Sequence, residues 1–99
     1  MTKFLKTNYN QTIAYNKIDG EKLGIVFLSG LKSDMTGQKA VALEEWAVEN
    51  NHSFLRFDYS GHGISSGKFN DFVISDWILD AKTIICLLYT SPSPRDGLL

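Results

Sequence analysis

The chain has 99 residues, 43% of them hydrophobic, and its 10 lysines and arginines nearly balance its 11 aspartates and glutamates, as in one globular unit. The net charge is −1, and the charged residues are scattered along the chain without forming a basic stripe. This argues against nucleic acid and against an anionic membrane as partners. One cysteine and two histidines are too few for a disulfide framework or a structural zinc site, so no metal is expected.

The apolar runs of the sequence are too short for a membrane span. The longest, Ile84–Tyr89, is far below the ~20 residues that a spanning helix needs. The first residues, Met1–Lys6, are interrupted by lysines too early to form a secretory signal. Together these observations predict a cytoplasmic protein.

Two short strands are predicted first, at Phe4–Thr7 and Thr12–Ile18, around a turn at residues 8–10. Apolar residues at alternate positions of the second run indicate a β-hairpin. The continuous apolar run Gly24–Ser29 then predicts a strand that is buried on both faces.

The remaining elements alternate helix and strand. Apolar residues at three- and four-residue spacing predict a helix over Gln38–Asn51, with Trp46 in its core-facing stripe. The run Ser53–Tyr59 is the next strand, and Ser75 is the expected N-cap of a last helix that buries Trp77. Strands that alternate with helices imply parallel strands and a sheet covered on both faces, so an α/β fold is expected.

The pattern changes after residue 85. The run Cys86–Asp96 has proline and serine punctuation without periodicity, which is typical of a flexible tail. It also resembles the translation of an adapter used in sequencing libraries. We therefore expect residues 1–85 to be the native domain segment and residues 86–99 to be a non-native tail.

One loop contains a motif of nucleophilic catalysis. Residues Gly63–Gly67 match G-x-S-x-G, and Asp58, His62 and Ser65 supply the three residue types of a catalytic triad. The motif needs a strand directly before it and a helix directly after it, and neither is predicted here. We therefore expect the glycines to let the backbone turn, Ser65 and Ser66 to bond locally, and His62 to lie near the mouth of a cleft.

Phosphate-binding motifs are incomplete. The dinucleotide fingerprint would need a glycine where Ser66 stands, and Gly67-Lys68 is not followed by serine or threonine. No cofactor is therefore expected. Arg56 and Asp58, two residues apart on one strand, share a face and are expected to form structural ion pairs or hydrogen bonds at the strand end.

Two stretches of the chain resemble the α/β-hydrolase superfamily. Gly24–Trp46 is similar to strand three, the oxyanion loop and helix A, and Arg56–Gly67 is similar to strand four and the loop after it. The stretch Leu-Lys-Ser-Asp-Met-Thr-Gly-Gln-Lys-Ala, residues 31–40, resembles the branch of acyl-glucuronide esterases and palmitoyl-protein thioesterases with its bacterial relatives. The resemblance covers nearly all of residues 3–85, the first third or so of a domain of about 200 residues or more.

The resemblance implies the N-terminal portion of a serine hydrolase that cleaves small acyl esters or thioesters through an acyl-enzyme. Its nucleophile follows strand five, so the chain is expected to end before the nucleophile elbow, to lack catalytic side chains and to be inactive alone. The family's oxyanion donor maps to the backbone N–H of Leu31, whose side chain would line the acyl pocket, and His62 is the second candidate for substrate contact. Many relatives carry histidine where Ser29 stands, which departs from the pattern.

The family's strand order also implies that strand four lies between strands two and three. Strand three would then expose the edge Ile25–Leu28, which favours aggregation of the chain when it is made alone. The alternative is a complete, small α/β protein that binds a partner or ligand and catalyses nothing. The coding sequence beyond Ile85 discriminates the two hypotheses, because only a hydrolase continues into a strand, G-x-S-x-G and a helix.

Overall fold

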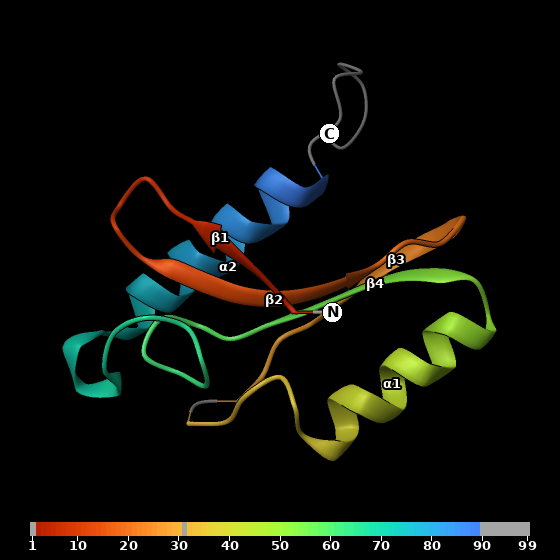
Figure 1. Cartoon of the computed structure of the whole chain (residues 1–99), viewed down its shortest axis with the longest axis horizontal. Helices are drawn as coiled ribbons and strands as arrows, with labels where there is room; N and C mark the ends of the chain where they lie inside the picture. Colours follow the sequence, from red (N-terminus) through yellow and green to blue (C-terminus); the bar gives the residue numbers. More distant parts are fainter. Residues whose placement is uncertain (1, 31, 90–99) are drawn as a thin grey trace.

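The computed structural model describes residues 2–30 and 32–89. A four-stranded sheet in the order β1-β2-β4-β3 carries α1 on one face and α2 on the other (Figure 1). The elements are β1 (Lys3–Lys6), β2 (Thr12–Ile18), β3 (Lys22–Phe27), α1 (Gln38–Glu49), β4 (His52–Phe57), a 3₁₀ helix (Phe69–Asp71) and α2 (Ile74–Tyr89). The α/β class, the hairpin and the two-sided helical cover are therefore confirmed.

The sheet is mixed. β1 and β2 form the predicted antiparallel hairpin, in which Asn10 adopts a φ of 68° and Thr7 N–H donates to the Gln11 carbonyl at 2.8 Å. β4 pairs antiparallel with β2 and parallel with β3. β4 thus lies between β2 and β3, as the family's strand order implied.

The expectation that the third strand is buried on both faces is wrong. Among the described residues β3 pairs with β4 alone and is an edge strand. Leu23 is 83% exposed and Leu28, directly after the strand, is 53% exposed. An apolar run indicates a strand that can be buried, but it carries no information on which neighbouring strands are present.

The predicted N-cap of the last helix is also wrong. α2 begins at Ile74, before Ser75, and the Asp76 carboxylate accepts the Val73 N–H at 2.8 Å. In this reach-back bond a side chain of the first helical turn accepts the N–H of the residue just before the helix, as the acidic residue of a capping box does. α2 continues past Ile85 to Tyr89, whereas residues 90–99 of the expected tail lie outside the described residues, so the boundary after residue 85 stays a prediction.

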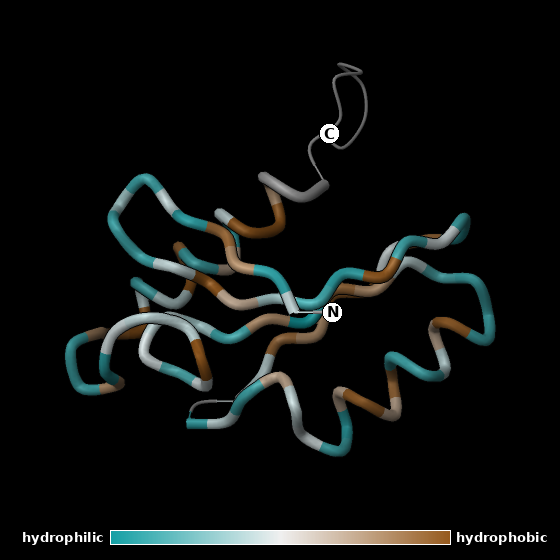
Figure 2. The backbone as a smooth tube through the Cα atoms, in the orientation of Figure 1, coloured by the Kyte–Doolittle hydropathy of each residue, from teal (hydrophilic) through white to brown (hydrophobic). Residues whose placement is uncertain are grey.

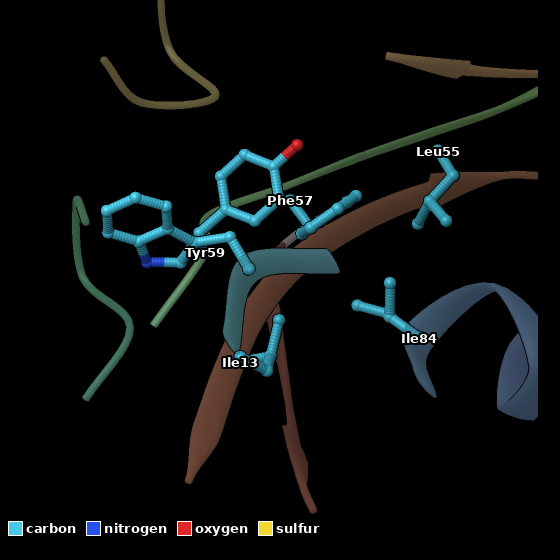
Figure 3. Packing of buried hydrophobic residues seen from close by; sticks show 6 residues of the cluster. Ile13, Leu55, Phe57, Tyr59 and Ile84 are labelled. Carbon is cyan, nitrogen blue, oxygen red and sulfur yellow. The ribbon is translucent and has the colours of Figure 1, made fainter. Parts of the chain in front are cut away.

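The main core lies between the sheet and α2. Ile84 of α2 is fully buried beside Leu55 and Ile13 of the sheet, and Phe57, Tyr59 and Trp77 extend the cluster (Figure 3). Burial of Trp77 confirms its predicted place in the core. Burying one such large side chain contributes roughly 1.5–3 kcal/mol.

The other face of the sheet holds a thinner layer. Hydrophobic residues recur on successive turns of α1 (Figure 2), but the fully buried ones are small, Ala40 and Ala47. Trp46, expected in the core, is 47% exposed and stacks on His52 with ring centroids 5.2 Å apart. The spacing placed Trp46 in the core-facing stripe, but in the structure the residues of α1 that are fully buried are the two alanines. None of the helices in residues 2–30 and 32–89 combines the length and apolarity of a membrane span.

Candidate functional site

The candidate site lies where the loops after β3 and β4 meet. Because β3 and β4 are parallel, their carboxyl ends open at the same edge of the sheet, the usual place for ligand sites in α/β folds. The loop from Leu28 to Gly37 and the loop from Asp58 to Lys68 lie side by side there (Figure 1), joined by the hydrogen bonds described below.

A tight turn follows β3. Ser33 N–H donates to the Gly30 carbonyl at 3.0 Å, and Lys32 adopts a φ of 63°. This left-handed conformation costs a non-glycine residue about 1–2 kcal/mol, so other contacts must hold it. Leu31, the sequence candidate for the oxyanion donor, lies outside the described residues.

Two side chains at the end of β4 bind the loop after β3 at Met35. The buried Asp58 carboxylate accepts the Met35 N–H at 2.8 Å through Oδ1 and the Ile64 N–H at 3.1 Å through Oδ2. Arg56 Nη1 donates to the Met35 carbonyl at 2.6 Å, and its Nη2 pairs with Glu44 Oε1 at 2.9 Å. The structural roles predicted for Arg56 and Asp58 are thus confirmed, and both converge on Met35.

His62 binds the loop after β3 at Lys32. Its Nε2 accepts the Lys32 N–H at 2.9 Å, and its Nδ1 lies 3.1 Å from the Ser60 carbonyl oxygen. The side chain is 4% exposed. Both ring nitrogens are therefore engaged inside the protein, and contact between His62 and a substrate stays a prediction.

Three aromatic rings surround the His62 imidazole. Their centroids lie 5.2 to 5.7 Å from it, in edge-to-face arrangements; they belong to Tyr59, Phe69 and Trp77. The Lys32 ammonium stands 4.9 Å from the Phe69 centroid. Lys32 is thus held at its backbone by His62 and at its side chain by a cation–π contact.

Ser65 does not have the surroundings of a nucleophile. Its hydroxyl accepts the Ala14 N–H at 2.9 Å and donates to the Asp58 carbonyl at 2.6 Å, and neither bond involves the His62 ring. Ser66 likewise accepts the Thr12 N–H at 2.9 Å. The two serines are structural, as expected, but their partners include β2, far along the chain, so the expectation of purely local bonds is wrong.

Asp80 is a site residue that sequence reasoning missed. It is fully buried, and its carboxylate accepts the Ser60 N–H at 2.7 Å and the Tyr9 hydroxyl at 2.6 Å. Partial burial, and secondarily the bond to Asp80, raises the pKa of Tyr9 to about 12. A carboxylate at helical spacing between Trp77 and Ile84 was the signal, since an acidic residue inside an apolar stripe needs buried partners.

An apolar groove of about 570 Å³ adjoins the loop after β3. Its walls come from the end of β3 and from α2, and they include Leu28, Ser29, Tyr59, Trp77 and Ile78. Within the part of the chain that the structure describes, the buried Ser29 hydroxyl makes no hydrogen bond. No cluster of three or more His, Cys, Asp or Glu side chains suited to a metal ion occurs in the part of the chain that the structure describes.

No family model matches the sequence. Among curated proteins, the chain is 40% identical over 82 residues to the palmitoyl-protein thioesterase ABHD10, mitochondrial, of Rattus norvegicus, covering 83% of this chain and 28% of that protein. Identity to the Homo sapiens protein of the same name is 40% over 80 residues, with coverages of 81% and 26%. The chain therefore spans little more than a quarter of these relatives.

Solved structures of hydrolases also resemble this chain. The mouse alpha/beta hydrolase domain-containing protein 10 matches with a TM-score of 0.82 and 38% identity over 86% of this chain and 34% of that chain. The esterase PF2001 of Pyrococcus furiosus matches with a TM-score of 0.72 and 25% identity, over 90% and 35%. The resemblance to the α/β hydrolases and the N-terminal portion of their fold are confirmed.

The expected cytoplasmic location is contradicted. The curated relatives are named as mitochondrial proteins. The expectation rested on the lack of a secretory signal in this sequence. Such a signal identifies secreted proteins, and its lack does not separate a cytoplasmic protein from a mitochondrial one.

Proposed function

Because the chain has the N-terminal portion of the α/β-hydrolase fold, we propose that it forms the N-terminal part of a serine hydrolase that cleaves small acyl esters or thioesters through an acyl-enzyme. The observation that carries the proposal is the 40% identity over 82 residues with a protein named as a thioesterase. The anchored loop after β3 supports it, since a backbone donor for an oxyanion must be held rigidly before reaction.

The segment's chemical contribution is one half of an oxyanion hole. The backbone N–H of Leu31 would donate to the oxyanion of the tetrahedral intermediate, and its side chain would line the acyl pocket. Support comes from the neighbours, because Gly30 precedes it in the turn after β3 and Lys32 follows it in a fixed conformation. Removing one such donor typically lowers kcat by about 10²–10³.

The 99-residue chain by itself should be inactive and poorly soluble. Among the described residues no serine hydroxyl bonds to the ring of His62 or of His52, so a nucleophile with its base has to come from elsewhere. No other described strand pairs with the outer, apolar edge of β3, and an unpaired edge of this kind templates association between chains. A monodisperse preparation of the 99-residue chain that unfolds cooperatively would contradict this expectation.

A long read of the source DNA across codon 85, without adapter-based fragmentation, tests the proposal first. A frame that reaches a strand, G-x-S-x-G and a helix within about 20–30 residues of codon 85 supports it. The protein from that frame should then hydrolyse p-nitrophenyl esters and acyl thioesters and react with a fluorophosphonate probe. Replacing the serine of the new motif by alanine should abolish both signals.

The opposite outcome is equally informative. A source DNA that encodes Cys86–Leu99 followed by a stop codon would overturn the hydrolase proposal. It would favour a small α/β binding protein whose partner covers β3.

A further inference from the structure

We propose that His62 is a positioning residue for the oxyanion loop, an inference that rests on the function proposed above. The neutral imidazole holds Lys32, the residue directly after the proposed oxyanion donor, through the Lys32 N–H. In this role His62 acts on the reaction through the Lys32 peptide group and not by contact with the reacting atoms.

The partners of the ring determine which nitrogen carries the proton. A backbone N–H can only donate, so Nε2, which faces the Lys32 N–H at 2.9 Å, must be the acceptor. A carbonyl oxygen can only accept, so Nδ1, 3.1 Å from the Ser60 carbonyl, must carry the hydrogen. The arrangement therefore requires the neutral Nδ1–H tautomer, since an imidazolium would direct a second N–H at Lys32.

The bond to Lys32 matters because this residue is strained. Lys32 has a φ of 63°, a conformation that a side chain disfavours. Without an acceptor at Nε2, its N–H would lose its partner inside the protein, and the turn would relax toward an ordinary conformation. The preceding peptide group, which carries the proposed donor, would rotate with it.

The surroundings make the ring a rigid support. His62 is 4% exposed and its ring meets Tyr59, Phe69 and Trp77 edge to face, while Trp77 Nε1 also donates to the Ser60 carbonyl at 2.9 Å. An imidazole packed in this way cannot swing to another partner. Phenylalanine fits the same aromatic cage without a nitrogen acceptor, so a His62→Phe variant separates packing from hydrogen bonding.

A misplaced oxyanion donor has a specific kinetic signature. The oxyanion exists only in the transition state and the tetrahedral intermediate, so weakening its donor lowers kcat and leaves KM nearly unchanged. Loss of the His62 bond disturbs the donor without deleting it. We expect a fall of about tenfold to a hundredfold in kcat, below the ~10²–10³ of a deleted donor.

The experiment uses the full-length hydrolase that contains this segment. We expect His62→Phe to lower kcat as stated, with KM changed less than about twofold. His62→Gln should recover most of kcat, because the amide oxygen reaches the position of Nε2 and accepts the Lys32 N–H. His52→Phe is the matched control, since His52 lies at the opposite end of β4 and stacks on Trp46.

Two kinetic results would overturn the inference. One is an unchanged kcat in His62→Phe; the other is an equal loss in His62→Phe and His62→Gln. A long-range ¹⁵N–¹H spectrum of the wild-type protein at pH 8 tests the bond without a variant that must fold, and an Nε2–H tautomer for His62 would also refute it. A wild-type protein that hydrolyses no ester or thioester and binds no fluorophosphonate would instead refute the proposed function, and the same spectrum would still decide whether His62 accepts from Lys32.

Discussion

Replacing Ser65 by alanine separates the structural interpretation of the G-x-S-x-G motif from the catalytic one. The Ser65 hydroxyl is buried and bridges β2 to the end of β4, accepting from Ala14 N–H and donating to the Asp58 carbonyl. The substitution removes both bonds and leaves the Ala14 N–H buried without an acceptor. An unsatisfied buried donor costs about 1–3 kcal/mol and a lost neutral hydrogen bond about 1 kcal/mol, so we expect a loss of roughly 2–4 kcal/mol in the free energy of unfolding.

Ser66→Ala is the matched control for this prediction. Ser66 makes the same two kinds of bond, to Thr12 N–H at 2.9 Å and to Gln11 Oε1 at 2.7 Å, but it is only half-buried. Water can replace its bonds, so we expect a loss of about 0.5–1.5 kcal/mol. Urea denaturation of the full-length protein and both variants measures the two differences.

Activity decides between the interpretations. If Ser65 is structural, the folded Ser65→Ala protein keeps kcat within about threefold and still reacts with a fluorophosphonate probe. A nucleophile would instead lose kcat by ~10⁴ or more and lose the labelling, with little change in stability. Loss of labelling at an unchanged free energy of unfolding would therefore refute the assignment of Ser65 to the scaffold.

Three further predictions follow from other buried contacts of the structure. Gly63→Ala should destabilise the protein by more than about 3 kcal/mol in urea denaturation, because Gly63 has a φ of 49° and an added Cβ would overlap the Asp58 carboxyl. Arg56→Met should cost about 3–5 kcal/mol in the same assay, since it leaves the Glu44 carboxylate, 15% exposed, without its cation. The raised pKa of Tyr9, about 12 when folded against 10.0 for the ordinary phenol, stabilises the fold below pH 10, and this contribution is lost as the pH rises toward 12. Tyr9→Phe should therefore flatten the fall in the free energy of unfolding between pH 10 and 12.

Control variants at less crowded or more exposed positions test whether burial causes the expected losses of stability. Gly30→Ala should leave stability nearly unchanged, because the nearest atom to an added Cβ, Ser33 Oγ, is 3.8 Å away. Asp19→Asn breaks an ion pair whose carboxylate is 91% exposed and should have no measurable effect. Equal losses in Arg56→Met and Asp19→Asn, or in Gly63→Ala and Gly30→Ala, would contradict the reasoning from burial. A Tyr9→Phe protein with an unchanged alkaline slope would contradict the role of Tyr9.

Local patterns in the sequence determined the elements and their order. The alternation in Thr12–Ile18 identified the hairpin, the spacing of apolar residues identified α1, and the missing strand and helix around Gly63–Gly67 argued against a nucleophile at Ser65. These features could be predicted because each arises from neighbours within a few positions, where the period of side chains along a strand or helix dictates which faces can be buried.

Tertiary structure alone decided which neighbours each element meets. The same apolar pattern fits a central or an edge strand, so only the assembled sheet shows that β3 is an edge among the described strands. Only the packing of α1 on the sheet shows that Trp46 is exposed. The contact between His62 and Lys32 joins residues 30 positions apart, and it arises because two parallel strands end at one edge of the sheet. Residue types in a sequence indicate what a loop can do, whereas the atoms that its side chains reach depend on how distant segments pack.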